Sequence, residues 1–454
     1  MDSAQTRIRI AASTGWVLLG NVVPMLAALA AVPWFLQRLG QERFGVLSLV
    51  WVVVGYFSFL DMGLGRAVTV AVAPYRLPGA GPGASAGDGL LHERDILGAA
   101  SALLGGVGLG ICALLAVALA LWGLPINMSS EQLRQEATYA VWVMLPGIPL
   151  LLLSSILRGH LEGAGAFRPL NLLRTPTGVL LVLGPCLTAL FTPSLVWACA
   201  AILLVRAANL LVLIQLVARE MSLRLRELVR TLLFGGHLVW LRRLLSFGSW
   251  ATVSNLVGPV IVYIDRFVIA AMLTASAVAA YSVPFDVVSR LPVIVASLCS
   301  VLLPELARFS ARSDPGSPHA AGGTARHMVR QSTIASALVV VALVVMAMIA
   351  APTALLWWLG ADFANQSTAV TQVLLLAFGV NAMAQIPFTA LQACGHARAV
   401  ALVHLLEILP YVGLVIWAVG SYGLLGAAWA WTLRGILDYA ALAWLWRKVH
   451  TQSR

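Results

Sequence analysis

Residues Phe44–Arg66 read FGVLSLVWVVVGYFSFLDMGLGR, and this stretch decides the fold. Its first part, residues 44–60, is apolar apart from two serines, two glycines and a tyrosine. At about 1.5 Å per residue it nearly crosses a hydrocarbon core of about 30 Å. Four residues that break the apolar pattern then follow within six positions: Asp61, Gly63, Gly65 and Arg66. Charges at this place in a membrane helix either reach for the interface or line a water-filled cavity.

The composition of the whole chain extends this interpretation. The chain has 454 residues, of which 60% are hydrophobic and 10% are charged, and its mean hydropathy is +0.90. These values are typical of a polytopic membrane protein and exclude a soluble globular protein. The net charge of +11 is therefore not taken as a sign of nucleic-acid binding. The five cysteines form no CxxC pair, so neither a zinc site nor a disulfide framework is predicted.

Apolar runs of about 20 residues predict twelve transmembrane helices in an all-α fold. They fall near residues 12–37, 43–74, 94–122, 134–157, 168–191, 194–218, 245–273, 277–306, 328–358, 367–393, 397–418 and 423–446. The hydrophilic segments between them are short, so the chain has no room for a soluble catalytic domain.

The arginines predict the orientation. With a cytoplasmic N-terminus, the inner segments carry twenty-one basic residues and the outer segments carry three, Arg38, Arg43 and Arg134. Positively charged residues concentrate on the cytoplasmic side of membrane proteins. We therefore expect both termini in the cytoplasm of a bacterial cell, with the chain in the inner membrane.

The two halves of the chain resemble one another. Leu161, Gly165 and Arg168 recur as Leu391, Gly395 and Arg398 at a constant shift of 230 residues. Six helices in each half predict two lobes of the same orientation, with a central cavity between them. The predicted domains are residues 1–220, an Arg-rich cytoplasmic connector at 221–243, and residues 244–454.

Ten ionisable residues remain inside the predicted spans, where charge is costly and usually faces a wet interior. They are Arg66, Arg206, Arg266, Arg290, Arg434, Asp61, Asp265, Asp286, Glu407 and Asp438. Two pairs are spaced by four residues, Asp286 with Arg290 and Arg434 with Asp438. Each pair shares a helical face and has mutual neutralisation as its simplest explanation.

The other charges lack such a partner. Arg206 and Glu407 have no opposite charge within reach on their own helices. Asp265 and Arg266 are adjacent, so they point about 100° apart and do not simply cancel. Arginine matches phosphate oxygens in bidentate geometry. The predicted substrate-binding residues are Arg266, Arg290, Arg206 and Arg66, and the predicted ion-coupling residues are Asp265, Asp286, Glu407 and Asp61.

A glycine run at residues 105–110 lies inside a predicted span and follows no strand, so it is not a nucleotide-binding loop. Its Gly106 and Gly110 form a GxxxG pattern, which predicts a close helix contact. No Walker motif occurs, so ATP is not the expected direct energy source and no cofactor is predicted.

Three stretches carry a resemblance to a known family: residues 44–66, residues 155–174, and the segment from Tyr263 to Leu291. They resemble the polysaccharide-biosynthesis flippases of the Wzx type, in the multidrug/oligosaccharidyl-lipid/polysaccharide exporter superfamily. The resemblance implies a carrier that turns undecaprenyl-pyrophosphate-linked oligosaccharide across the inner membrane by alternating access. It also implies cavity arginines that bind the pyrophosphate and a proton or sodium gradient that resets the carrier. Membrane lipids and other polysaccharide assembly proteins are its expected partners.

Two other functions remain open from the residues alone. A drug or cation antiporter of the same superfamily favours a cavity of acids and aromatic residues, and the equal numbers of arginines and acids argue only mildly against it. A membrane-embedded saccharide polymerase or ligase needs a substantial outer loop with catalytic residues, and the outer loops are short.

Overall fold

The computed structural model describes residues 24, 26–59, 64–72, 86–235, 240, 261–292, 295, 318–393 and 397–451. Within these residues the regular structure is entirely helical. The chain divides into two compact units, Met1–Pro259 and Val260–Arg454. The predicted connector and the predicted start of the second lobe fall partly outside the described residues, so the predicted domain boundaries stay predictions.

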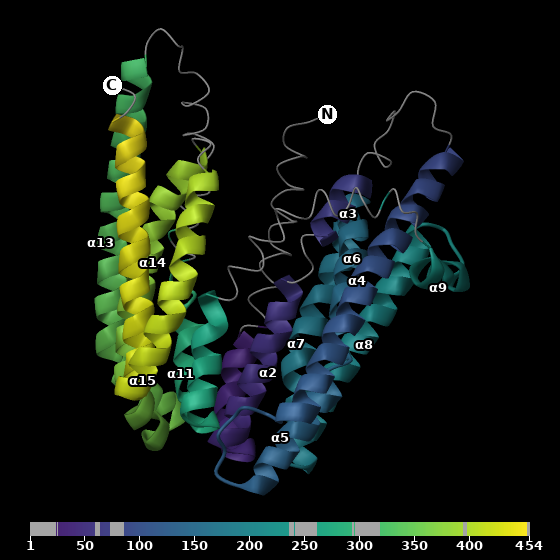
Figure 1. Cartoon of the computed structure of the whole chain (residues 1–454), viewed down its shortest axis with the longest axis horizontal. Coiled ribbons are helices and arrows are strands. Elements are labelled where there is room, and N and C mark those ends of the chain that lie inside the picture. The colour runs from purple at the N-terminus through teal and green to yellow at the C-terminus, as the bar shows by residue number, and fades with distance from the viewer. Residues whose placement is uncertain are drawn as a thin grey trace. The chain divides into compact units, whose positions relative to one another are not determined.

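The first unit is built around a central helix (Figure 1). Its described helices are α2 (Gln41–Phe59), α3 (Leu64–Val72), α4 (Ala86–Trp122), α5 (Glu131–Met144), α6 (Gly147–Gly163), α7 (Phe167–Phe191), α8 (Leu195–Glu220) and α9 (Leu225–Phe234), after a helical segment at Leu26–Leu39. Helix α6 packs against α2, α3, α4, α7 and α8. Because five helices pack against it, α6 is the central helix of the first unit.

Helices α3 and α6 touch through their backbones. A Cβ atom added to Gly159 would lie 2.1 Å from the carbonyl oxygen of Gly65, and one added to Gly163 would lie 2.8 Å from that of Thr69. The Thr69 hydroxyl donates a 3.0 Å hydrogen bond to the carbonyl oxygen of Gly159. Small residues allow this close approach, and the Thr69 hydroxyl supplies a donor to a backbone carbonyl oxygen, a group that needs a partner in the membrane interior.

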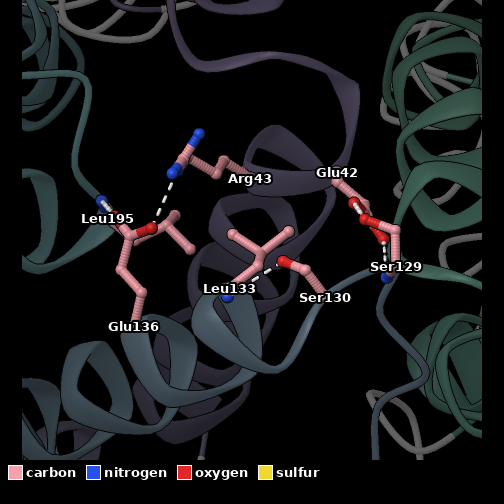
Figure 2. Close-up of polar contacts among 7 residues, drawn as sticks. All are labelled: Glu42, Arg43, Ser129, Ser130, Leu133, Glu136 and Leu195. Carbon is pink, nitrogen blue, oxygen red and sulfur yellow. Dashed lines mark hydrogen bonds and ion pairs between the residues drawn. The ribbon is translucent and has the colours of Figure 1, made fainter.

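A polar cluster joins the first turns of three helices in this unit. Figure 2 shows Glu136 of α5 accepting hydrogen bonds from Arg43 Nε, at 2.9 Å, and from the backbone N–H of Leu195, at 2.7 Å. Glu42 accepts from the backbone N–H of Ser129 at 2.7 Å, and Ser130 caps α5. These contacts satisfy N–H groups that the starts of α5 and α8 leave without partners.

The second unit contains helical residues 261–272 and α11 (Ala275–Val288), α13 (Pro318–Leu359), α14 (Ala361–Ala393) and α15 (Ala397–Thr451). Helices α13, α14 and α15 lie side by side, and α11 packs against α14 (Figure 1). The Ser367 hydroxyl of α14 donates a 3.0 Å hydrogen bond to the carbonyl oxygen of Ala280 in α11. Helix α14 is the central helix of this unit.

Helix α15 is two helices joined at Gly423, where φ is 60°. Three contacts relate the two parts: Tyr411 packs edge-on against Trp431, Arg434 pairs with Glu407, and His404 pairs with Asp438. The farther a residue lies before Gly423 in the chain, the farther its partner lies after Gly423. This pattern identifies an antiparallel helical hairpin, and glycine is the residue that adopts such a φ without strain.

Seven helices of the described residues are long and apolar enough to cross a membrane. The last of them, Ala399–Lys448, has 50 residues. At about 1.5 Å per residue this is more than twice the thickness of the hydrocarbon core, so the break at Gly423 makes two crossings of it. The chain is therefore a multi-pass membrane protein, and the total of twelve spans stays a prediction.

The span predicted at 43–74 is covered by α2 and α3, and its residues 60–63 and 73–74 lie outside the described residues. The span predicted at 134–157 lies within one membrane-length segment, Glu131–Gly163, in which a turn at Leu145 and Pro146 separates α5 from α6. A proline inside a helix removes one backbone hydrogen bond and favours such a break.

Among the described residues, the predicted GxxxG face makes no close helix contact. A Cβ atom at Gly106 or Gly110 would meet no described atom within 4 Å, whereas one at Gly108 would lie 3.0 Å from Pro149 of α6. Helix α4 therefore turns a different glycine toward its neighbour, because the face that packs is set by tertiary contacts and not by the spacing alone.

Candidate functional site

The two adjacent charges of the seventh predicted span lie at the centre of a buried cluster in the second unit. Asp265 has no exposed surface, and Arg266 is 3% exposed. Their side chains diverge as predicted: the Asp265 Oδ1 atom accepts from the backbone N–H of Arg266 at 2.7 Å, while the Arg266 guanidinium reaches away. The adjacent positions on one helix thus serve two different partners.

The Arg266 guanidinium binds the next helix. Its Nη2 atom donates a 2.6 Å hydrogen bond to Asp286 Oδ1 on α11. Its carbon Cζ lies 4.7 Å from the ring centre of Phe285 and 5.5 Å from that of Tyr263. An arginine held by one carboxylate and two aromatic faces is fixed in position, because cation–π attraction is strong where water is excluded.

Tyr281 completes the surroundings of Asp265. The tyrosine is fully buried, and its hydroxyl donates a 2.5 Å hydrogen bond to Asp265 Oδ2. The carboxylate thereby gains a donor that compensates for the water it lost on burial. Tyr281 is thus a member of this cluster that the sequence pattern did not single out.

The predicted pairing of Asp286 with Arg290 is also corrected. Asp286 pairs with Arg266, and Arg290 lies exposed in the turn that follows α11. The reason is local, since α11 ends at Val288 and the four-residue helical spacing no longer applies beyond it. Within the described residues Arg290 makes no ion pair, so its charge faces outward from the end of the helix.

A second charged cluster lies inside the hairpin of α15. Arg434 Nη1 is 3.6 Å from Glu407 Oε2, and His404 Nε2 is 3.3 Å from Asp438 Oδ1. The side chains of Arg434 and Asp438 are 8% and 6% exposed. The predicted pairing of Arg434 with Asp438 along one helix is thus wrong, and Glu407 is not alone. Both errors have the same cause. The turn at Gly423 brings residues of the facing helix closer to these side chains than residues one turn away on the same helix.

Aromatic side chains connect the two clusters. The Arg434 carbon Cζ lies 4.2 Å from the ring centre of Trp431 and 5.6 Å from that of Tyr411. Trp431 also contacts Phe285, which covers Arg266. Arg266 and Arg434 therefore share one buried aromatic layer.

Arg206 of α8 is the predicted site residue that the structure describes in the first unit. Its guanidinium is half-buried, and its Nε atom is buried without a hydrogen-bond partner among the described residues. A guanidinium with an unused donor inside the helical unit is suited to an anion.

Two predicted residues of this unit have no described side chain. Asp61 lies outside the described residues, and Arg66 lies in α3 but its side chain is not among those described. A buried pair that the sequence pattern did not predict is present instead: His160 Nε2 of α6 lies 3.1 Å from Glu93 Oε2 of α4. The two residues are 67 positions apart. Sequence spacing therefore gave no sign of this pair.

The pairing of His404 with Asp438 was also missed by the sequence analysis. His404 precedes Glu407 by three positions and so shares its helical face, which was an available signal. The contact of His404 with Asp438 depends on the hairpin, so the sequence pattern gave no signal of it.

Helices of membrane length that surround buried charges define a polytopic, all-helical membrane protein, and solved structures share this fold. The chain is similar to a multidrug resistance MATE family transporter of the MOP superfamily in an inward-facing conformation, with a TM-score of 0.74 and 15% identity over 96% of this chain and 98% of the other. It is also similar to the lipid II flippase MurJ in an inward closed conformation, with a TM-score of 0.69 and 11% identity over 96% of this chain and 90% of the other.

The sequence defines the family more narrowly. Residues 10–310 match the family described as polysaccharide biosynthesis protein, and the chain belongs to that family. It is 28% identical over 438 residues to a protein of Shigella flexneri named "Putative O-antigen transporter", covering 96% of this chain and 97% of that protein. The predicted family and the predicted superfamily fold are confirmed.

Proposed function

We propose that this chain is a flippase that moves undecaprenyl-pyrophosphate-linked oligosaccharide units across the bacterial inner membrane for the synthesis of a surface polysaccharide. The observation that carries the proposal is its family membership, together with end-to-end similarity to a protein named as an O-antigen transporter. The likeness to a lipid II flippase is consistent with the fold that this task requires.

The arginines have different roles in this proposal. Arg290 is exposed and unpaired within the described residues, so it is free to bind a phosphate oxygen. Arg206 has an Nε donor without a partner among the described residues and binds an anion in the first unit. Arg266 is already neutralised by Asp286, so it binds substrate only in a conformation that breaks this pair. The role of Arg66 in binding, and that of Asp61 in coupling, rest on the sequence.

The energy for transport comes from an ion gradient. Protons or sodium ions are the expected coupling ions, and Asp265, Asp286 and Glu407 are the candidate residues, since ionisable groups at membrane depth mark ion pathways. Both termini lie in the cytoplasm in this proposal. The chain acts as a transporter without catalytic chemistry, alongside other polysaccharide assembly proteins.

Two functions compete with this one. A drug or cation antiporter has the same fold, so the structural likeness to a MATE transporter does not separate it from a flippase. A saccharide polymerase or ligase forms glycosidic bonds and leaves longer saccharides on the lipid. Each function therefore predicts a different change in the lipid-linked intermediates or in drug efflux when the chain is missing.

The experiment is a leaflet-resolved assay of the lipid-linked intermediate in a strain that lacks the chain. We expect single units to accumulate on the cytoplasmic leaflet, and complementation to move them outward. Collapse of both ion gradients should stop this movement while ATP is still present. Accumulation of the units on the periplasmic leaflet would favour the polymerase or ligase, and unchanged intermediates with altered drug efflux would favour the antiporter.

A further inference from the structure

Helix α9 follows the membrane-length helix α8 and is too short to cross a membrane itself. It has 10 residues, which at about 1.5 Å per residue is about half of the hydrocarbon core. A turn separates it from α8. In this turn the backbone N–H of Leu223 donates a 2.9 Å hydrogen bond to the carbonyl oxygen of Ala218, and Ser222 has a φ of 52°. Helix α9 therefore begins where a membrane span ends, after a turn with its own backbone hydrogen bonds.

One side of α9 packs against the protein. The helix lies against α4 and α8 (Figure 1), and its buried side chains are Leu228 and Thr231. A Cβ atom added to Gly98 of α4 would lie 2.5 Å from the carbonyl carbon of Gly235, so the end of α9 touches the α4 backbone. These contacts hold α9 in place on the first unit.

The contact with α4 also gives the depth of α9 in the membrane. The membrane-length segment of α4, Leu91–Trp122, has 32 residues, whereas the hydrocarbon core needs about 20. Trp122 is 78% exposed at one end of this segment, and tryptophan is enriched at the membrane interface. With Trp122 at one interface, the core ends about 6 Å before Gly98 is reached. Helix α9 therefore lies at the level of the lipid headgroups, on the side where the arginine distribution predicts the cytoplasm.

The exposed side of α9 is both basic and apolar. Arg226 and Arg230 are exposed and lie four residues apart, so they share a helical face. The side chains of Leu225, Leu233 and Phe234 are 48%, 66% and 83% exposed. These five residues form the outer face of α9. Large apolar side chains beside arginines on a short surface helix are typical of a helix that lies in the membrane interface.

The charges of the outer face are available to a partner. Within the described residues, neither Arg226 nor Arg230 has a hydrogen bond or an ion pair from its guanidinium. Residues 219–234 carry four arginines and two glutamates, so this segment has an excess of positive charge. Its Glu227 lies in the first turn of α9, where the free N–H groups of a helix start stabilise a carboxylate.

We propose that the outer face of α9 binds anionic phospholipid. Leu225, Leu233 and Phe234 then lie at the boundary of the acyl chains, and Arg226 and Arg230 contact the phosphates of lipids with a net negative charge. A lipid is the occupant because the outer face lies at headgroup depth and combines apolar surface with unpaired cations. A basic residue near an anionic membrane surface strengthens the attraction by about fivefold, and the pair by up to about 25-fold. The inference does not depend on the proposed function, because it involves neither oligosaccharide nor coupling ion.

The test is hydrogen–deuterium exchange of the full-length protein in two kinds of lipid nanodisc, measured by mass spectrometry. One contains phosphatidylcholine alone, which has no net charge, and the other contains phosphatidylcholine with the anionic phosphatidylglycerol. We expect the amides of residues 225–234 to exchange more slowly in the anionic nanodisc, by up to about 25-fold. The double variant Arg226→Gln with Arg230→Gln should abolish this difference. Sodium chloride at about 0.5 M should reduce it in the unaltered protein, because salt screens exposed charges.

Glu227→Gln is the matched control, since it removes an exposed charge of the opposite sign from the same helix. This variant should keep the difference between the two nanodiscs or enlarge it. Loss of the difference in Glu227→Gln would assign it to a general loosening of α9 and contradict the lipid site. Inorganic phosphate added to the phosphatidylcholine nanodisc should leave the exchange unchanged. Slower exchange with phosphate alone would assign the arginines to a soluble anion instead.

Other results would overturn the proposal. Equal exchange of α9 in the two nanodiscs would exclude the lipid site, and so would a difference that persists in the double variant or at high salt. Faster exchange of the double variant in phosphatidylcholine alone would mean that the arginines hold α9 on the protein. Exchange of residues 91–98 of α4 identifies a misfolded variant, and the lipid and salt comparisons on the unaltered protein require no substitution.

Discussion

The guanidinium of Arg266 and the carboxylate of Asp286 are joined by a 2.6 Å hydrogen bond between two consecutive helices of the second unit. Arg266 is 3% exposed, whereas the Asp286 side chain is 62% exposed. The pair therefore anchors a buried cation to a carboxylate at the surface of the unit. Arg290, which is nearer to Asp286 in sequence, does not take part in this pair.

This pair predicts unequal effects of two substitutions. Asp286→Ala leaves the buried Arg266 without its charged acceptor and should lower the free energy of unfolding by about 2 kcal/mol. Arg290→Ala removes an exposed side chain in a turn and should change stability by less than about 0.5 kcal/mol. Thermal unfolding in detergent measures both. Equal destabilisation by the two changes would restore the pairing of Asp286 with Arg290.

Arg290 should be important for transport although it contributes little to stability. We expect Arg290→Ala and Arg206→Ala to abolish complementation in the leaflet assay while the protein still reaches the membrane. Lysine at either position should restore only part of the activity, since it keeps the charge and loses the bidentate geometry. Arg330→Ala, at an exposed arginine of α13, is the control and should complement fully. Normal transport by Arg290→Ala would remove this residue from the binding site.

The close contact of α3 with α6 predicts a strong effect at one glycine. Gly159→Ala places a methyl group 2.1 Å from the Gly65 carbonyl oxygen, so the helices must separate. We expect a loss of about 2–3 kcal/mol, the upper range for overpacking. Gly106→Ala is the matched control, because its methyl group meets no described atom within 4 Å and alanine favours the helix. Similar unfolding temperatures for the two variants would contradict the contact.

The cluster around Glu136 in Figure 2 predicts a further difference between two acidic residues of one helix. Glu136→Ala removes the acceptor for both Arg43 and the Leu195 N–H, and should cost about 2–3 kcal/mol. Glu131→Ala removes a 71% exposed side chain that lies 3.9 Å from Arg134, and should cost less than about 1 kcal/mol. Chemical unfolding of both variants in the same detergent checks the order, and a reversed order would refute the structural role of Glu136.

The orientation is tested by reporter fusions. Fusions after residues 80, 230 and 320 should report the cytoplasm, and fusions near 126 and 362 should report the periplasm, because arginine-rich segments stay inside. A periplasmic signal at 230 would contradict both the twelve-helix count and the parallel repeat.

The repeat itself gains support from burial within each unit. Within the apolar 18-residue stretch of each membrane-length segment, the buried share is highest in Glu131–Gly163 of the first unit, at 61%, and in Ala361–Leu391 of the second, at 67%. The other five are 17–22% buried. The two buried segments begin 230 positions apart, which is the shift that relates Leu161 to Leu391 in the sequence. Equivalent helices thus occupy the centre of each unit.

The sequence by itself determined the membrane class, the helical fold and the family. Apolar runs of span length can satisfy their backbone groups only as helices in lipid, so hydropathy is sufficient for these conclusions. It also placed Asp265 and Arg266 on diverging faces, because adjacent residues of a helix must diverge.

Only the tertiary structure decided which charges meet. The four-residue spacings predicted Asp286 with Arg290 and Arg434 with Asp438, and the structure pairs Asp286 with Arg266 and Arg434 with Glu407. Spacing describes neighbours along one helix, whereas a buried charge is stabilised by the closest opposite charge, whichever helix carries it. The end of α11 at Val288 and the turn at Gly423 set those distances, and neither is encoded in the charges themselves.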